Sequence, residues 1–338
     1  MQVSENVLLK PYNTFGITAR ARYFAPFASE NELLELVEGQ RGGQLPQMIL
    51  GGGSNILFTQ DFNGWVLKNE IRGIEIVGED NDHVYVKAGA GENWHGFVQH
   101  CIAQGLAGLE NLSLIPGNVG ASPMQNIGAY GVEIKDVFHE LEALHLEDSR
   151  MVTFGNADCQ FGYRESIFKK AYRRQFAILS VTYRLNKQPH FNTSYGAINE
   201  ELQRMDVQEL SIRAVSQAVI NIRSSKLPDP AQIGNAGSFF KNPTVSKEKY
   251  EALQVAFPKM VAYPVGEEQY KLAAGWLIEQ CGWKGYRKGD AGVHAKQALV
   301  LVNYGHARGR EIYDLSQEVL DSVEEKFGVL LEREVNVM

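Results

Sequence analysis

The sequence lacks the features that mark membrane-bound, secreted and metal-clustering proteins. No stretch of it approaches the roughly 18 consecutive apolar residues of a membrane-spanning helix. The first residues, MQVSENVLLKPYNTFG, contain no charged region followed by a long apolar run, so we expect no secretion signal. The three cysteines, Cys101, Cys159 and Cys281, are too widely spaced for a disulfide framework or a CxxC metal site. A reduced cytoplasmic protein without a metal site is the simplest interpretation.

Positive charge is also scarce. The chain carries 33 Lys and Arg against 40 Asp and Glu, a net charge of −7, whereas sequence-independent nucleic-acid binding needs a basic surface. This balance argues against a nucleic-acid partner, but a small anionic ligand needs only a few local cations. No feature indicates an obligate protein partner. At 338 residues, the chain exceeds one small core, and we predict two or three domains.

Helix and strand signals are both present, which predicts an α+β protein with two lobes. Helices are expected after the capping-box pair Ser29 and Glu32, and over residues 94–102, 211–223, 271–281 and 312–327, the last ended by Gly328. Strands are expected over residues 48–50, 83–88, 141–146, 178–185, 298–303 and 329–337.

In one segment, residues 105–131, the apolar residues follow neither the helical nor the strand spacing. It contains six glycines and two prolines with apolar residues between them. A long irregular segment inside a compact domain is usually functional or disordered, and its apolar content argues against disorder. We therefore predict an ordered loop that wraps around a ligand.

A second glycine-rich turn, GGGSN, directly follows the apolar run at residues 48–50. Glycine permits positive φ and close backbone approach, so successive N–H groups can turn toward one anion. The pattern is neither GxGxxG nor GxxxxGK[ST], so neither the Rossmann nor the P-loop signature applies. A tight turn is the alternative for GGGSN taken alone. Together, the two glycine-rich segments favour a dinucleotide held by two loops, although their spacing does not identify it.

Longer motifs give a specific resemblance. They are NTFG, GGGSNILF, GAGENWH, GLENLSLIPGNVGASPMQNIGAYGVE, FGYRESIF, SSKLPDP, GNAGSFFKNP, KLAAGWLIEQCG and LEREV, in this order over nearly the whole chain. With these motifs the chain resembles the UDP-N-acetylenolpyruvoylglucosamine reductase family, flavoenzymes of bacterial cell-wall precursor synthesis. Tyr195 in TSYGAI matches the tyrosine that a mobile loop brings over the substrate in the longer class of this family.

The resemblance implies a two-subdomain FAD-binding fold of the vanillyl-alcohol-oxidase type, with a separate α+β substrate-binding domain. The expected boundaries are residues 1–67 and 68–210 for the two FAD-binding subdomains, 211–325 for the substrate-binding domain, and 326–338 for a C-terminal strand. FAD is expected to bind non-covalently along the two glycine-rich segments. The matching positions are Gly51, Gly52, Gly53, Ser54, Asn55, Pro116, Gly117, Gly120, Ser122, Gln125, Asn126, Ile127, Gly128 and Tyr130.

The implied reaction has two half-reactions in one pocket. NADPH reduces the flavin, and the enolpyruvyl sugar nucleotide then accepts hydride from the flavin. Hydride addition beside the substrate carboxylate builds an enolate, which needs cations or donors to stabilise it and an acid to protonate the neighbouring carbon.

Three residues match the family's catalytic positions: Ser238 as proton donor, Arg164 for the carboxylate or enolate, and Glu334 to polarise the enolate site or relay the proton. Taken alone, each has an ordinary structural interpretation: a Ser in a glycine-rich turn, a surface Arg and a solvent-facing Glu. Glu332 is the rival of Glu334, because both lie on one face of the expected final strand. Position in the LEREV motif favours Glu334.

The resemblance also places a set of polar residues around the substrate. These are Tyr195, Arg223, Lys226, Asn242, Tyr263, Lys284 and Gln297. Two positions depart from the family: Gly52 and Asn336 stand where some relatives carry an acidic residue and an arginine, respectively. The departure at Gly52 should be harmless in a backbone cradle, while Asn336 changes the charge expected near the flavin.

Two other functions fit parts of this pattern. An FAD-dependent alcohol or sugar oxidase of the same fold often links its flavin covalently through His or Cys. His95 is the only histidine close to the first flavin-binding half, and neither glycine-rich segment contains a Cys. A non-catalytic nucleotide-binding module is the second alternative, and a protein that binds no flavin would favour it.

Overall fold

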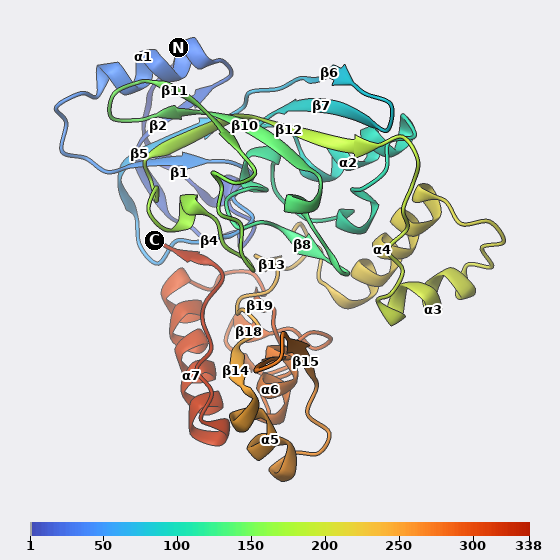
Figure 1. Ribbon diagram of the computed structural model, residues 1–338. Helices are drawn as coiled ribbons and strands as arrows, with labels where there is room; N and C mark the ends of the chain where they lie inside the picture. Colours follow the sequence, from blue (N-terminus) through green and yellow to red (C-terminus); the bar gives the residue numbers. More distant parts are fainter. Residues whose placement is uncertain (1) are drawn as a thin grey trace. The chain divides into compact units, whose positions relative to one another are not determined.

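The structure, a computed structural model, describes residues 2–338 and divides into two compact units (Figure 1). The first unit contains the N-terminal segment up to Val7, Ala21–Gly52 and Asn63–Ser225. The second contains Leu8–Arg20, Gly53–Phe62 and Lys226–Met338. The three boundaries expected after residues 67, 210 and 325 stay predictions.

The smaller sheet of the first unit is covered by helix α1 (Glu30–Gly39). Its strands, in the order β1-β2-β5-β3, are β1 (Ser4–Leu8), β2 (Arg20–Phe27), β5 (Phe62–Asn69) and β3 (Gln47–Leu50). The predicted cap of α1 is confirmed, because Ser29 Oγ accepts the N–H of Glu32 at 3.2 Å. The Glu32 carboxylate reaches back one residue further than predicted, to the N–H of Ala28 at 2.6 Å.

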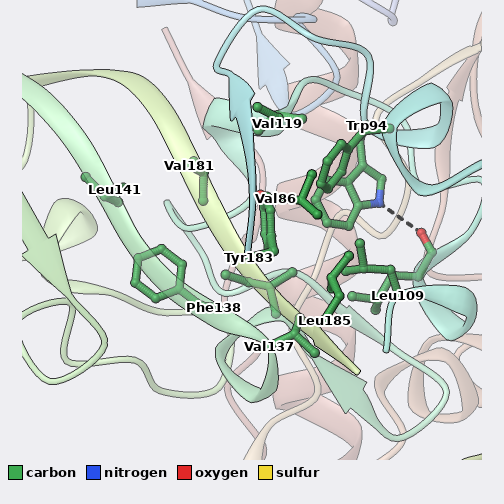
Figure 2. Packing of buried hydrophobic residues seen from close by; sticks show 14 of the residues in the cluster. Val86, Trp94, Leu109, Val119, Val137, Phe138, Leu141, Val181, Tyr183 and Leu185 are labelled. Carbon is green, nitrogen blue, oxygen red and sulfur yellow. Dashed lines mark hydrogen bonds between the residues drawn. The ribbon is translucent and has the colours of Figure 1, made fainter. Parts of the chain in front are cut away.

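The larger sheet has five antiparallel strands and carries the main core. In spatial order they are β11 (Met151–Gly155), β10 (Phe138–His145), β12 (Phe176–Asn186), β7 (His83–Gly89) and β6 (Ile74–Glu79). Figure 2 shows Val181, Tyr183 and Leu185 of the central strand β12 packing toward Trp94 of helix α2 (Trp94–Ala103). Ala177 and Leu179 of β12 belong instead to the core under α1. The start of β12 is therefore buried on both faces, since Ile178 belongs to the main core, and this explains the apolar run at residues 176–179. From Ser180 on, polar and apolar residues alternate.

The irregular segment 105–131 is ordered, as predicted. It contains short 3₁₀ turns at Glu110–Leu112 and Val119–Ala121, and strand β8 (Gly128–Ala129), which pairs with β9 (Val132–Glu133). Leu109, Leu112 and Val119 are fully buried. Their burial supplies the apolar anchor that keeps a glycine-rich loop in one conformation.

Two helices complete the first unit. Helix α3 (Gly196–Arg204) packs its buried Ile198 and Leu202 against Ala218, Val219 and Ile222 of α4 (Ile212–Lys226). Helix α4 confirms the helix predicted over residues 211–223, and Tyr195 stands at the N-terminus of α3.

The second unit combines short sheets with three helices. Its strands are β4 (Ile56–Leu57), β13 (Gly234–Asn235), β14 (Thr244–Ser246), β15 (Ala262–Val265), β16 (Gln269–Leu272), β17 (Arg287–Lys288), β18 (Ala291–Val293), β19 (Leu301–Asn303) and β20 (Asn336–Val337). Its helices are α5 (Lys247–Ala256), α6 (Ala274–Gln280) and α7 (Gly309–Phe327). The predicted apolar stripe of α7 is buried, and Gly328 ends the helix with φ +60°.

Three predicted elements of the second unit are shorter than expected. The helix predicted over 271–281 begins at Ala274, because Lys271 and Leu272 pair with β15. The strand predicted over 298–303 begins at Leu301, because a turn closes from Val300 N–H to the Gln297 carbonyl at 3.1 Å. The final strand predicted over 329–337 is reduced to β20, since the partner segment around Phe240 pairs with the chain only near Arg333.

A membrane-crossing helix is not found: within residues 2–338, none is both long and apolar enough to span a bilayer.

Candidate active site

From Gly53 on, the first glycine loop belongs to the second unit and is shaped by a contact with the NTFG motif of that same unit. Thr14 donates its N–H to the Gly53 carbonyl at 3.0 Å, and Gly53 has φ +64°. A Cβ added at Gly53 would lie 2.0 Å from the carbonyl oxygen of Tyr12, so no other residue fits this position. In a trans peptide the C=O and the following N–H point in opposite directions. The Ser54 N–H therefore points away from Thr14.

The second glycine-rich segment meets the first at Gly52, within the first unit. A Cβ on Gly52 would lie 2.6 Å from Asn118 Oδ1 and 3.0 Å from the Cα of Gly117. Trp94 donates its N–H to the Gly117 carbonyl at 3.0 Å, which turns the N–H of Asn118 the other way. A side chain at Gly52 would therefore require the Asn118 side chain and the Gly117 backbone to shift.

Some of the predicted cofactor residues have side chains that serve the protein itself. Ser122 Oγ lies 2.6 Å from the Tyr183 hydroxyl in the core. The amide of the buried Asn126 donates to Glu133 at 2.9 Å and to the Gly162 carbonyl at 3.0 Å, and accepts the Lys135 N–H at 3.1 Å. These two residues are buried, and their side chains shape the loop.

The remaining predicted cofactor positions lie along the same two loops. Pro116 is exposed, whereas Gly120, Gln125, Ile127 and Gly128 are partly buried. Gly120 is packed directly on Ala90, whose Cβ would lie 2.5 Å from a Cβ added at Gly120. Gly51 is partly buried at the end of β3, and Asn55 joins the C-terminal segment through a 3.4 Å bond from its Nδ2 to the Glu334 carbonyl.

Arg164 belongs to the first unit and reaches back to the glycine-rich segment. It has φ +56°, its Nη2 donates to the Gly128 carbonyl at 2.7 Å, and its guanidinium lies 5.3 Å from the centre of the Tyr163 ring. The partial burial predicted from its apolar neighbours is confirmed. A planar guanidinium held by a carbonyl and an aromatic ring suits a carboxylate ligand.

A second cationic group, Arg223, projects from α4 toward the same segment. Its Nε donates to the Leu114 carbonyl at 3.2 Å, and among residues 2–338 this is the one hydrogen bond of its guanidinium. Burial is the main effect and lowers the pKa of Arg223. The interaction with Tyr130 raises this pKa, and the positive charge of Arg164 lowers it. Two guanidinium groups that repel each other in a partly buried place favour an anion between them.

Two tyrosines border this cationic region. Tyr130, with φ +51°, and Tyr195 pack edge to face with their ring centres 5.4 Å apart. Burial raises the pKa of Tyr130, an effect that Arg223 opposes. Tyr195 is 45% exposed, so its ring does not fill the core.

Ser238 and Glu334 lie on neighbouring segments of the second unit. Phe240 and Arg333 form an antiparallel bridge, and Glu334 donates its N–H to the Phe239 carbonyl at 2.8 Å. Ser238 is exposed, just before the fully buried Phe239. Asn336 ties the segment to the first glycine loop, since its N–H and its Nδ2 donate to the Asn55 carbonyl at 3.1 and 3.0 Å. The backbone of residues 334–336 therefore lies beside Asn55 of the GGGSN turn.

The other predicted substrate residues are distributed over the second unit. Lys226 is exposed at the end of α4, and Tyr263 on β15 is 47% exposed. Lys284 forms an ion pair with Glu279 at 3.0 Å. Asn242 Oδ1 accepts the N–H of Ala274 at 3.0 Å and so caps α6, and Gln297 Oε1 accepts the N–H of Leu299 at 3.3 Å.

Two residues of the site were missed by the sequence interpretation. Asn118, in the second glycine-rich segment, packs against Gly52 of the first. Its Nδ2 donates to the Gly91 carbonyl at 2.7 Å. Thr14 holds the GGGSN turn through its N–H, and its carbonyl accepts the Asn235 N–H at 3.0 Å. Both lie in motifs of the resemblance, PGNVG and NTFG, but a contact between segments so distant in sequence leaves no local signal.

Comparisons with known proteins agree with this arrangement. Residues 21–155 match the FAD binding domain, and residues 229–338 match the UDP-N-acetylenolpyruvoylglucosamine reductase, C-terminal domain. The chain is 52% identical to the UDP-N-acetylenolpyruvoylglucosamine reductase of Amoebophilus asiaticus, with 100% of both chains covered.

Solved structures extend the comparison to the fold. The UDP-N-acetylenolpyruvylglucosamine reductase of Thermus caldophilus matches with a TM-score of 0.70 and 26% identity, covering 100% of this chain and 99% of that one. A nicotine-derivative oxidase from Arthrobacter nicotinovorans matches with a TM-score of 0.50 and 13% identity, over 97% of this chain and 86% of that one. The second likeness concerns the fold alone and confirms the predicted flavin-binding type.

Proposed function

This chain belongs to the UDP-N-acetylenolpyruvoylglucosamine reductase family, and we propose that it reduces the enolpyruvyl group of UDP-N-acetylglucosamine enolpyruvate with NADPH, through FAD, giving UDP-N-acetylmuramate for peptidoglycan synthesis. The observation that carries the proposal is the meeting of the two glycine-rich segments at Gly52, inside a chain that matches its relatives over their full length. We further propose that it acts in the cytoplasm on small molecules alone, without an obligate protein partner.

The residues of the two loops fit FAD. Glycine-rich turns such as these let successive backbone N–H groups approach a phosphate closely, and Gly53 and Gly117 both have positive φ. When bound, the flavin would transfer hydride from NADPH to the substrate alkene. Neither loop contains a Cys, and His95 Nδ1 already accepts the Leu114 N–H at 3.0 Å, which agrees with non-covalent binding.

The first unit would stabilise the negative charge of the reaction. Arg164 and Arg223 are the cations that we assign to the substrate carboxylate, the enolate or the diphosphate, because each lies on the glycine-rich segment and is partly buried. Tyr195 would cover the bound sugar nucleotide. Lys226, Asn242, Tyr263, Lys284 and Gln297 of the second unit would complete the substrate contacts.

The second unit would supply the proton. An exposed Ser238 hydroxyl can protonate the enolate carbon, since that carbon becomes strongly basic after hydride addition. Glu334 would polarise the enolate site or relay the proton to Ser238. The ladder between residues 239–241 and 332–334 supports this pairing of roles, because it fixes both backbones.

The experiment separates the two half-reactions by anaerobic stopped-flow absorbance. Addition of NADPH should bleach the flavin, and subsequent addition of the enolpyruvyl sugar nucleotide should restore its absorbance. Failure of the sugar nucleotide to reoxidise the flavin would contradict the proposed reaction. The oxidase alternative predicts a different result, reduction of the flavin by an alcohol or sugar and reoxidation by oxygen.

A further inference from the structure

Residues 112–114 of the glycine-rich segment are tied to helices α2 and α4 by polar contacts. Trp94 Nε1 donates to the Leu112 carbonyl at 2.9 Å, the bond that Figure 2 draws as a dashed line. The hydroxyls of Ser113 and Ser216 lie 2.8 Å apart, and Gln99 Nε2 donates to Ser216 Oγ at 3.1 Å. The segment is thus fixed between two helices just before Leu114.

Leu114 itself links one residue of each helix. Its N–H donates to His95 Nδ1 on α2 at 3.0 Å, and its carbonyl accepts from Arg223 Nε on α4 at 3.2 Å. Because Nδ1 is the acceptor, a neutral His95 carries its proton on Nε2. Leu114 has φ +58°, a left-handed conformation that costs a non-glycine residue about 1–2 kcal/mol. Hydrogen bonds on both sides of Leu114 offset that cost.

We propose that His95 is a positioning residue for the reaction: its neutral imidazole holds the Leu114 peptide in the left-handed conformation, and the Leu114 carbonyl thereby aims the Arg223 guanidinium at an anionic group of the substrate. This inference rests on the proposed function, in which Arg223 contacts the sugar nucleotide. His95 lies outside the expected set of site residues. Its proposed role is indirect, because it acts on Arg223 through the Leu114 peptide.

The surroundings of His95 keep it neutral near pH 7. Burial lowers its pKa, and the positive charge of Arg223 lowers it further. Arg223 in turn interacts with Tyr130 and Arg164 from the other side. Protonation would turn Nδ1 into a donor facing the Leu114 N–H and would place a second positive charge beside Arg223. Arg223 should therefore lose its position as the pH falls through the pKa of His95, which lies below the ordinary value.

The test compares two substitutions at this position. His95→Leu removes the acceptor, whereas His95→Asn keeps an oxygen near the place of Nδ1 but cannot be protonated. We expect His95→Leu to raise the KM for the sugar nucleotide about threefold to tenfold, the value of one lost hydrogen bond, with a smaller change in kcat. His95→Asn should retain most of the wild-type KM at pH 7. His100→Leu, at an exposed position on the same helix, is the control and should behave as wild type.

The pH profile distinguishes positioning from simple packing. In the wild type the KM for the sugar nucleotide should rise as the pH falls through the lowered pKa of His95, and this rise should be absent in His95→Asn. The cost of His95→Leu should also fail to add to that of Arg223→Gln in the double variant, because both changes break one chain of contacts. An identical acid rise in wild type and His95→Asn, or fully additive costs, would overturn the proposal. If His95→Leu does not fold, the His95→Asn profile decides alone.

These outcomes separate the inference from the proposed function. A wild-type enzyme that does not reduce the enolpyruvyl group contradicts the function. An active wild type whose His95 variants keep both the KM and its pH dependence contradicts the role of His95 alone.

Discussion

The two units hold their candidate site residues in different ways. In the second unit, Ser238 and Glu334 are placed by the main chain, through the Phe240–Arg333 bridge and the bond from Glu334 N–H to the Phe239 carbonyl. In the first unit, Arg164 and Arg223 are placed by their own side chains, which donate to the carbonyls of Gly128 and Leu114. Arg164 and Leu114 are left-handed, as are Tyr130 and Asn126.

This difference predicts that substitutions in the two units have different effects. A side chain that only projects from a main-chain ladder can be removed without moving its neighbours. A side chain that also holds a loop cannot, because its loss frees the carbonyl it bonds and relaxes the backbone around it. Substitution of Ser238 should therefore change the reaction alone, while substitution of Arg164 or Arg223 should change the reaction together with ligand binding.

Ser238→Ala gives the largest expected effect and tests the first half of this contrast. Loss of the acid should slow flavin reoxidation by the sugar nucleotide about 10²–10⁴-fold, the usual contribution of general acid catalysis. Reduction of the flavin by NADPH and the thermal unfolding temperature should stay at wild-type values. Single-turnover absorbance measures both steps.

The matched control is Ser246→Ala, the N-cap of α5, whose Oγ accepts the Lys249 N–H at 3.2 Å. That variant should lose about 1 kcal/mol of stability and keep both half-reactions. If Ser238→Ala slows both half-reactions equally, Ser238 is not the specific acid.

Arg164→Ala comes next and tests the second half of the contrast. Loss of the guanidinium should slow reoxidation by the substrate about 10²–10³-fold, as for other donors aimed at a developing anion. Because Arg164 also holds the Gly128 carbonyl, the variant should bind FAD more weakly, and flavin fluorescence titration measures this. Arg164→Lys should not restore the rate, since a single ammonium cannot replace the planar fork. Wild-type turnover in Arg164→Ala would end its assignment.

Sequence patterns predicted what depends on local order. The helical period gave α2, α4 and α7, and the Ser29 and Glu32 pair gave the start of α1. The predictions that were wrong concern contacts between residues distant in sequence. The helix expected from residue 271 starts at Ala274, whose N–H is accepted by the Asn242 side chain.

The candidate site shows the same division. Both glycine-rich segments were predicted as ligand loops from composition, and the family motifs supplied the candidate residues. The requirement for glycine at Gly53, by contrast, comes from the carbonyl of Tyr12, a contact that only the folded chain creates. The side chains of Ser122 and Asn126 are likewise committed to the core and to the loop by tertiary contacts.

A pair of glutamates sharpens the contrast within the second unit. Glu334→Gln should slow the second half-reaction about 10²-fold, the lower end of acid–base contributions. Glu332→Gln should stay within about twofold, because the Glu332 side chain is 74% exposed and its 3.1 Å ion pair with Lys241 is of a kind worth about 0–1 kcal/mol. Steady-state kinetics at two salt concentrations measures both variants. A larger loss in Glu332→Gln would reverse the choice between the two carboxylates.

Tyr195→Ala gives the smallest expected effect and returns to the side-chain contacts of the first unit. The ring is 45% exposed and packs edge to face on Tyr130, a contact worth about 0.5–1.5 kcal/mol. Its removal should raise the KM for the sugar nucleotide about threefold to tenfold, because a covering group then no longer holds the substrate. The KM for NADPH should change much less, and Tyr195→Phe should recover most of the effect that comes from the ring. Equal changes in both KM values would show that Tyr195 shapes the whole pocket through Tyr130 rather than covering the substrate.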